Sequence, residues 1–157
     1  MKIERASWFK PRYVVTDAAG RRSVWQGHNF RAGLSADLDG HRCELRQDGR
    51  KRFVLLVDGV EAAEAIRWGR EWQVHAAGSS YDLLRASRWR SRIEVVAAGE
   101  TIGTVRRGSG PRSSAQSDLP GDLPLPVQAL IGFVAMMTWR QEASVAGTGA
   151  GAIATGG

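Results

Sequence analysis

Residues 127–139 read VQALIGFVAMMTW, the longest apolar stretch of this 157-residue chain. Pro124 and Pro126 lie at its start, where the amide hydrogens that proline lacks would have no partner within a helix anyway. Apolar side chains cover nearly every face of a helix built from this stretch, so the helix must be surrounded by other apolar groups. The stretch is shorter than the ~20 residues that a helix needs to cross a bilayer. The sequence therefore predicts a buried helix over residues 126–140.

The part of the chain that precedes this helix carries turn signals at short intervals. Asp-Gly pairs stand at 39–40, 48–49 and 58–59, and Ala-Gly pairs follow at 77–78 and 98–99. Asp-Gly supplies the positive φ angles that a tight two-residue hairpin turn requires. The segments between the turns are rich in β-branched and aromatic residues, and their apolar and polar residues largely alternate, as in strands with one buried face. We expect strands at 12–16, 23–26, 42–46, 53–57, 61–68, 72–75, 81–85, 92–96 and 101–106.

Two segments depart from this simple pattern. Residues 61–68 (EAAEAIRW) consist mostly of strong helix formers. They directly follow the Asp58-Gly59 turn, however, and can pair back on the preceding strand as the second arm of a hairpin, so we predict a strand there. Residues 108–126 are rich in Gly, Ser, Pro and Asp. That composition is typical of a surface loop.

Together these elements predict a mainly β fold. We expect roughly ten antiparallel strands in hairpins, in a sheet that curls around the one hydrophobic C-terminal helix. A curled sheet surrounds such a helix with apolar side chains and needs no lipid to do so. Residues 1–141 are expected to form this single domain. Residues 142–157, rich in Gly and Ala, are expected to form a flexible tail.

This order of elements resembles the tubby C-terminal-like superfamily, nearer to its LURP-one-related and phospholipid-scramblase-like branches than to tubby itself. The resemblance covers residues 7–141 and includes the hairpin segment 35–41 (SADLDGH) and the Asp58-Gly59 turn. It implies a closed barrel of about twelve antiparallel strands with the helix in its lumen. With this resemblance the expected fold is a mainly β antiparallel β-barrel of about ten to twelve strands in hairpins, which encloses the one hydrophobic C-terminal α-helix. Tubby proteins bind phosphoinositides through basic residues, and scramblase-like members associate with membranes. Only Asp118 and Asp122 precede the helix, where the scramblase-like branch has an acidic calcium-binding segment, so the resemblance does not imply lipid scrambling.

Motifs of enzymatic chemistry are absent from the sequence. His28, His41 and His75 are widely separated, and the chain contains no His-Glu-x-x-His pair, Gly-x-Ser-x-Gly elbow or phosphate-binding glycine loop. Cys43, the single cysteine, lies within an expected strand and is predicted to be a buried thiol. We expect no enzymatic activity, no cofactor and no metal site. The charged N-terminal residues give no export signal, and with one cysteine a reducing, cytoplasmic location is expected.

Positive charge is the most informative feature for function. The chain contains 22 Lys and Arg against 16 Asp and Glu, a formal net charge of +6. The basic residues cluster at expected strand ends and turns, and several clusters on one barrel rim would attract phosphate-bearing partners. The alternative is a scattered, solvated basic surface. The candidate anion- or lipid-binding residues are Arg50, Lys51, Arg52, Arg67, Arg70, Arg85, Arg88, Arg90, Arg106 and Arg107.

Three of the six tryptophans lie among these arginines: Trp68, Trp72 and Trp89. Such rings can lie at a membrane interface or stack on a nucleic-acid base, and they can equally cap the end of a barrel beneath a guanidinium group. We therefore expect a non-enzymatic interaction module that binds anionic phospholipid headgroups, as a cytoplasmic protein that associates peripherally with the membrane. The alternatives are a nucleic-acid-binding barrel and a structural partner domain of a larger assembly.

Overall fold

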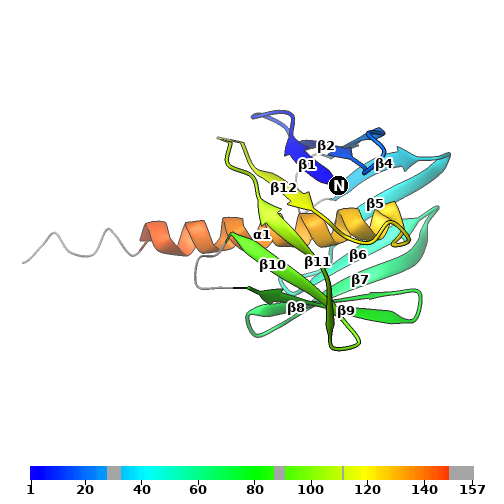
Figure 1. Cartoon of the computed structure of the whole chain (residues 1–157). Coiled ribbons are helices and arrows are strands. Elements are labelled where there is room, and N and C mark those ends of the chain that lie inside the picture. The colour runs from blue at the N-terminus through cyan, green and yellow to red at the C-terminus, as the bar shows by residue number, and fades with distance from the viewer. Residues whose placement is uncertain (28–32, 87–90, 111, 149–157) are drawn as a thin grey trace, which may run out of the picture.

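The computed structural model describes residues 1–27, 33–86, 91–110 and 112–148. Twelve strands surround one helix, as Figure 1 shows. The elements are β1 (Lys2–Arg5), β2 (Arg12–Thr16), β3 (Arg22–Gln26), β4 (Leu34–Leu38), β5 (His41–Gln47), β6 (Arg52–Val57), β7 (Val60–Trp68), β8 (Glu71–Ala76), β9 (Ser79–Arg85), β10 (Arg92–Ala97), β11 (Glu100–Arg107), β12 (Ser114–Ser117) and α1 (Leu125–Thr148).

The sheet is a closed antiparallel barrel in which each strand pairs with the strand that precedes it in the chain. The first and last strands close the ring, and Ile3 of β1 lies opposite Ala115 of β12. This arrangement confirms the predicted mainly β barrel with its single C-terminal helix. It also confirms residues 61–68 as strand, because β7 pairs with both β6 and β8 despite its helix-forming composition.

Four of the hairpins use the tight turns that the sequence predicts. Asp39 and Asp58 have φ angles of 51° and 50°, and the glycine after each has a φ near 80° (82° and 81°). Two positive φ angles in succession are the signature of a type I′ turn, whose twist matches that of the flanking strands. Ala77 and Ala98 adopt the same left-handed conformation, at φ 49° and 51°, although they lack a side chain that favours it.

The core lies between the inner face of the barrel and the helix. Phe133 of α1 is fully buried, with its ring centroid 5.3 Å from that of Tyr13 and 5.6 Å from that of Trp25. Leu130 and Val134 are buried as predicted, and Met137 is partly buried against the same core. Aromatic edge-to-face contacts of this kind add to the free energy gained by burying apolar area. The helix is thus held by strands from the first part of the chain.

The structure corrects two expectations. Three short strands were not expected, β1, β4 and β12, and the last of these lies inside the 108–126 segment expected to be a loop. The helix continues to Thr148, so residues 142–148 are helical rather than part of a flexible tail. Ala and Glu favour helix there, and contacts of Gln141 and Glu142 with the barrel, described below, hold the helix where this extension begins. Within the described ranges, no helix is long and apolar enough to cross a membrane.

Candidate functional site

The connections between strands fall alternately at the two ends of the barrel, because each strand runs opposite to its predecessor. The β1–β2, β3–β4, β5–β6, β7–β8, β9–β10 and β11–β12 connections therefore share one end. The C-terminal part of α1 leaves the barrel at this end, where Gln141 contacts Arg67 at the end of β7. We call this end the helix-exit rim, which lies on the left in Figure 1, and the other end the helix-entry rim.

The helix-exit rim gathers the basic residues that the sequence singles out. All of those that the structure describes lie at the ends of strands or in connections at this rim. They are Arg50, Lys51, Arg52, Arg67, Arg70, Arg85, Arg106 and Arg107. Arg88 and Arg90 lie outside the described residues. Clusters that are far apart in the chain thus come to one end of the molecule.

Arg52 is largely neutralised within the protein. Its guanidinium forms ion pairs of 2.9 Å with Glu64, 2.6 Å with Asp48 and 3.2 Å with Glu61. The hydrogen bonds to Glu64 and Asp48 raise the pKa of Arg52 above its usual value. A cation with three carboxylate neighbours has little charge to offer a further anion, so Arg52 is a weak candidate for binding.

Arg67 and Arg85 hold the end of the helix. Nη1 of Arg67 donates a hydrogen bond of 2.8 Å to Oε1 of Gln141, and Arg85 forms an ion pair with Glu142. Arg67 comes two residues after the buried Ala65, and Arg85 two residues after the buried Leu83. Both arginines therefore lie on the inward-facing side of their strands, and their side chains turn towards α1. They line a groove of about 480 Å³ between the helix and the rim, which Arg70 also lines.

A second set of cations is available to a partner. Arg50, Lys51, Arg70 and Arg107 are exposed, and within the described part of the chain their side chains make no hydrogen bond or ion pair. Arg106 is also exposed; its charge contributes to a lowered pKa of Asp118, whose main cause is the 2.6 Å hydrogen bond from the amide of Thr104. These cations are those on which an electrostatic interface would depend.

Sequence reasoning missed further basic residues of the same rim. They are Lys10, Arg12, Arg46, Arg112 and Arg140. All are exposed. Successive turns alternate between the two rims. Once the number of strands is known, the order of the hairpins therefore tells at which rim each of these basic residues lies. Lys10, Arg12 and Arg112 extend the basic rim around the β1–β2 and β11–β12 connections, Arg46 lies near the end of β5, and Arg140 lies on α1.

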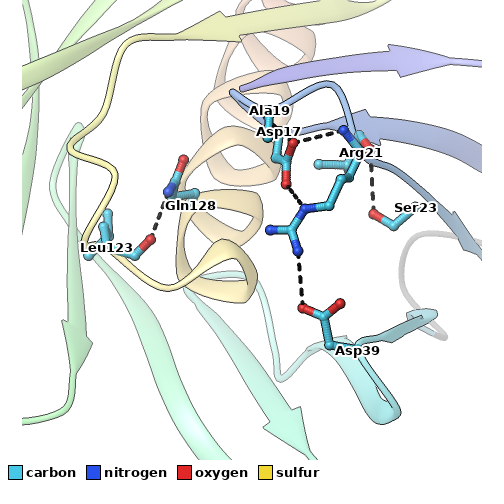
Figure 2. Close-up of polar contacts among 8 residues, drawn as sticks. Asp17, Ala19, Arg21, Ser23, Asp39, Leu123 and Gln128 are labelled. Carbon is cyan, nitrogen blue, oxygen red and sulfur yellow. Dashed lines mark hydrogen bonds and ion pairs between the residues drawn. The ribbon is translucent and has the colours of Figure 1, made fainter.

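The helix-entry rim is different in charge, since aspartates occupy its connections. The carboxylate of Asp17 accepts hydrogen bonds from the amides of Ala19 and Arg21, each 2.9 Å long (Figure 2). It also forms an ion pair with the Arg21 guanidinium, with Nε of Arg21 2.7 Å from Oδ2 of Asp17. These contacts, above all the bond from the Arg21 amide, lower the pKa of Asp17. Arg21 also lies 3.7 Å from Asp39. The other acidic residues of these connections are Asp58, Asp118 and Asp122.

The three candidate tryptophans have different environments. Trp68, at the end of β7, has 68% of its surface exposed. Trp72 is buried in the core with its ring 5.4 Å from that of Phe53, so its assignment as an interfacial or stacking residue was wrong. Trp72 shares the inward face of β8 with Val74 and Ala76, two and four residues further along, and this position on the strand decides its burial. Trp89 lies outside the described residues.

The cysteine and two of the histidines take structural positions. Cys43 is fully buried, as predicted, and burial raises the pKa of its thiol. His41 forms a 2.6 Å contact with Asp58 at the helix-entry rim, and His75 contacts the Ser80 hydroxyl at 2.9 Å. His28 lies outside the described residues. Among the described residues, no three His, Cys, Asp or Glu side chains lie close enough together to hold a metal ion.

Comparisons with known proteins give one partial similarity. The chain is 32% identical over 98 residues to methylenetetrahydrofolate–tRNA-(uracil-5-)-methyltransferase TrmFO of Synechococcus sp. (strain JA-3-3Ab). The aligned region covers 60% of this chain but only 22% of that protein. No family model and no solved structure matches the chain.

Proposed function

We propose that the protein is a non-enzymatic interaction module that docks on anionic phospholipid headgroups, from the cytoplasm, through the helix-exit rim. The observation that carries this proposal is the topology of the barrel, which brings the separate basic clusters to one rim. Exposed cations gathered at one end of the barrel fit a surface that presents many phosphates. Each Lys or Arg near an anionic membrane contributes about 1 kcal/mol to binding.

The division of roles among the arginines supports docking on a surface rather than capture of a single ligand. Arg67 and Arg85 are occupied by the helix, and Arg52 by three carboxylates. The exposed cations that remain, such as Arg50, Arg70 and Arg107, belong to different connections around the rim. Cations spread over a ring attract an extended anionic surface by their summed field.

Acidic residues at the opposite end would orient the molecule. The aspartates of the helix-entry rim are repelled by the same anionic surface that attracts the helix-exit rim. A barrel with this charge polarity approaches an anionic surface with its basic end first.

Nucleic-acid binding is the alternative that the test must separate from lipid docking. A relative of this chain is named for tRNA methylation, but the chain spans only 22% of that protein's length. Burial of Trp72 removes one of the three rings proposed for stacking on bases. The lipid proposal needs only the exposed cations. The third alternative, a structural partner domain, needs a large apolar patch and no affinity for phosphate.

Co-sedimentation with vesicles tests the proposal. We expect the full chain to pellet with vesicles of 70% phosphatidylcholine and 30% phosphatidylserine in low salt, and to remain in the supernatant with pure phosphatidylcholine. Salt near 0.5 M should weaken the binding strongly, because the Debye length falls to ~4 Å. Equal binding to neutral vesicles, or none to either, contradicts the proposal. Tight binding of labelled single-stranded RNA without binding to vesicles would support the nucleic-acid alternative instead.

A further inference from the structure

Exposed aromatic side chains are concentrated on the same rim as the exposed cations. Phe9 has 97% of its surface exposed, Trp8 58% and Trp68 68%. Trp8 and Phe9 belong to the β1–β2 connection, and Trp68 ends β7 beside the β7–β8 connection. At the helix-entry rim, Val60 is the large apolar side chain that the described residues expose, and it carries no ring.

The β1–β2 connection is built to present its two rings. The guanidinium of Arg5 donates hydrogen bonds to the carbonyl oxygens of Ser7 (2.9 Å) and Trp8 (3.3 Å), and the amide of Ala6 donates to Arg12 at 2.7 Å. Arg112, from the neighbouring β11–β12 connection, lies over the Trp8 ring at 5.7 Å. These contacts hold the backbone of the loop while the Phe9 ring projects into solvent.

The two aromatic positions lie across the barrel from each other. In the closed order of strands, the β1–β2 hairpin and the β7–β8 hairpin are separated by the same number of strands in either direction. The rings lie on opposite sides of the rim, with Arg50 on one arc between them and Arg107 on the other. Aromatic rings prefer the interfacial region of a bilayer, where basic residues meet phosphates.

We propose that Trp8 and Phe9 insert into the interfacial region of an anionic bilayer and that Trp68 makes a second contact across the rim. The inference rests on the proposed lipid docking and adds an apolar contribution to it. Attraction between charges brings the rim to the membrane, and burial of the rings then slows its departure. Binding should therefore retain a component that salt does not remove.

Single substitutions test the insertion against a matched control. Phe9→Ser should lower the affinity for phosphatidylcholine/phosphatidylserine vesicles about tenfold or more, since the free energy of burying a phenyl ring is lost. Trp68→Ser should weaken binding in the same direction. Val60→Ser removes an exposed apolar side chain from the opposite rim and should leave the affinity unchanged.

A fluorescent label directly tests whether position 9 enters the bilayer. Cys43 is fully buried, so a nitrobenzoxadiazole thiol label on the folded protein should react with a cysteine placed at position 9 (Phe9→Cys) or, as control, at position 60 (Val60→Cys). With anionic vesicles we expect a blue shift and quenching by spin-labelled lipid at position 9 and neither at position 60. Vesicle binding without a response at position 9 overturns insertion but leaves electrostatic docking intact. Absence of any vesicle binding overturns both.

Discussion

Nη1 of Arg67 donates a hydrogen bond of 2.8 Å to Oε1 of Gln141, a residue 74 positions further along the chain. Arg85 forms an ion pair with Glu142, the next residue of the helix. The rim therefore holds the helix where it leaves the lumen. Two of the arginines that the sequence suggests for ligand binding are used for this structural purpose.

Arg67→Ala should loosen the helix at its exit. We expect faster amide hydrogen exchange in residues 139–147 and little change in the strands, because the core contacts of the helix lie further inside the barrel. Hydrogen exchange measured by mass spectrometry checks this. Arg70→Ala removes a charge that lines the same groove but makes no hydrogen bond or ion pair with the described part of the helix, and should leave exchange unchanged. Equal effects of the two substitutions would contradict the assigned role of Arg67.

Phe133→Ala should destabilise the protein by about 3–5 kcal/mol, since it removes a fully buried ring between Tyr13 and Trp25 and leaves a cavity. Urea denaturation followed by tryptophan fluorescence measures the change. Val145→Ala lies on the exposed part of the same helix and should change the free energy of unfolding by less than about 0.5 kcal/mol. A loss below about 1 kcal/mol for Phe133→Ala would show that the helix does not organise the core.

Ala98→Asn should stabilise the β10–β11 hairpin. Ala98 has a φ of 51°, a left-handed conformation that costs alanine about 1–2 kcal/mol and that asparagine adopts more readily. We expect a gain of up to about 1 kcal/mol in the free energy of unfolding. Ala18→Asn, in a turn where the residue has no positive φ, should give no such gain. A loss of stability for Ala98→Asn would contradict the type I′ assignment.

The contact between His41 and Asp58 predicts a pH dependence. The hydrogen bond to Asp58 raises the pKa of His41 above 6.5, and the same bond lowers the pKa of Asp58 below 3.8. The contribution of His41 to stability is therefore full below pH 6.5 and is lost as the pH rises through the raised value. That of Asp58 is present above pH 3.8 and is lost as the pH falls through the lowered value.

We accordingly expect His41→Gln to lower the thermal unfolding midpoint more at about pH 5.5 than at about pH 8.5. In the protein with Asp58→Asn, the pKa of His41 measured by NMR titration should fall towards its ordinary value. An equal effect of His41→Gln at both pH values would show that the charged pair does not contribute to folding.

Much of the fold could be predicted from the sequence, because local chemistry decides it. The turns at Asp39-Gly40 and Asp58-Gly59, the alternating strands between them and the helix that is apolar on every face all point to one architecture. β12 could not be predicted in this way. Its sequence, SAQS, has low β propensity, and it becomes a strand because β1 and β11 leave a gap that only this segment is placed to close.

The candidate site was predictable in composition but not in arrangement. Which clusters share a rim depends on the number of strands between them, and one missed strand reverses the assignment of every later turn. The pairing of Arg67 and Arg85 with the helix depends on how far α1 extends, since Gln141 and Glu142 lie beyond the residue 140 at which we expected it to end. Exposure of Phe9 depends on the conformation of one loop, on which the sequence pattern carries no information.

The central claim is that one rim of the barrel docks on anionic membranes. The most direct test compares two variants that lose the same amount of positive charge, one at each rim. Arg50→Gln with Arg70→Gln removes two exposed cations from the helix-exit rim, and Arg22→Gln with Arg42→Gln removes two from the helix-entry rim.

Both double variants have the same net charge, and the measurement is their affinity for phosphatidylcholine/phosphatidylserine vesicles by co-sedimentation at low salt. Loss of two rim cations should cost about 2 kcal/mol, or roughly a 30-fold loss of affinity, for the first variant, and the second should bind nearly as tightly as the unaltered protein. Equal loss in both variants would show that net charge, and not the basic rim, governs binding, and would contradict the account.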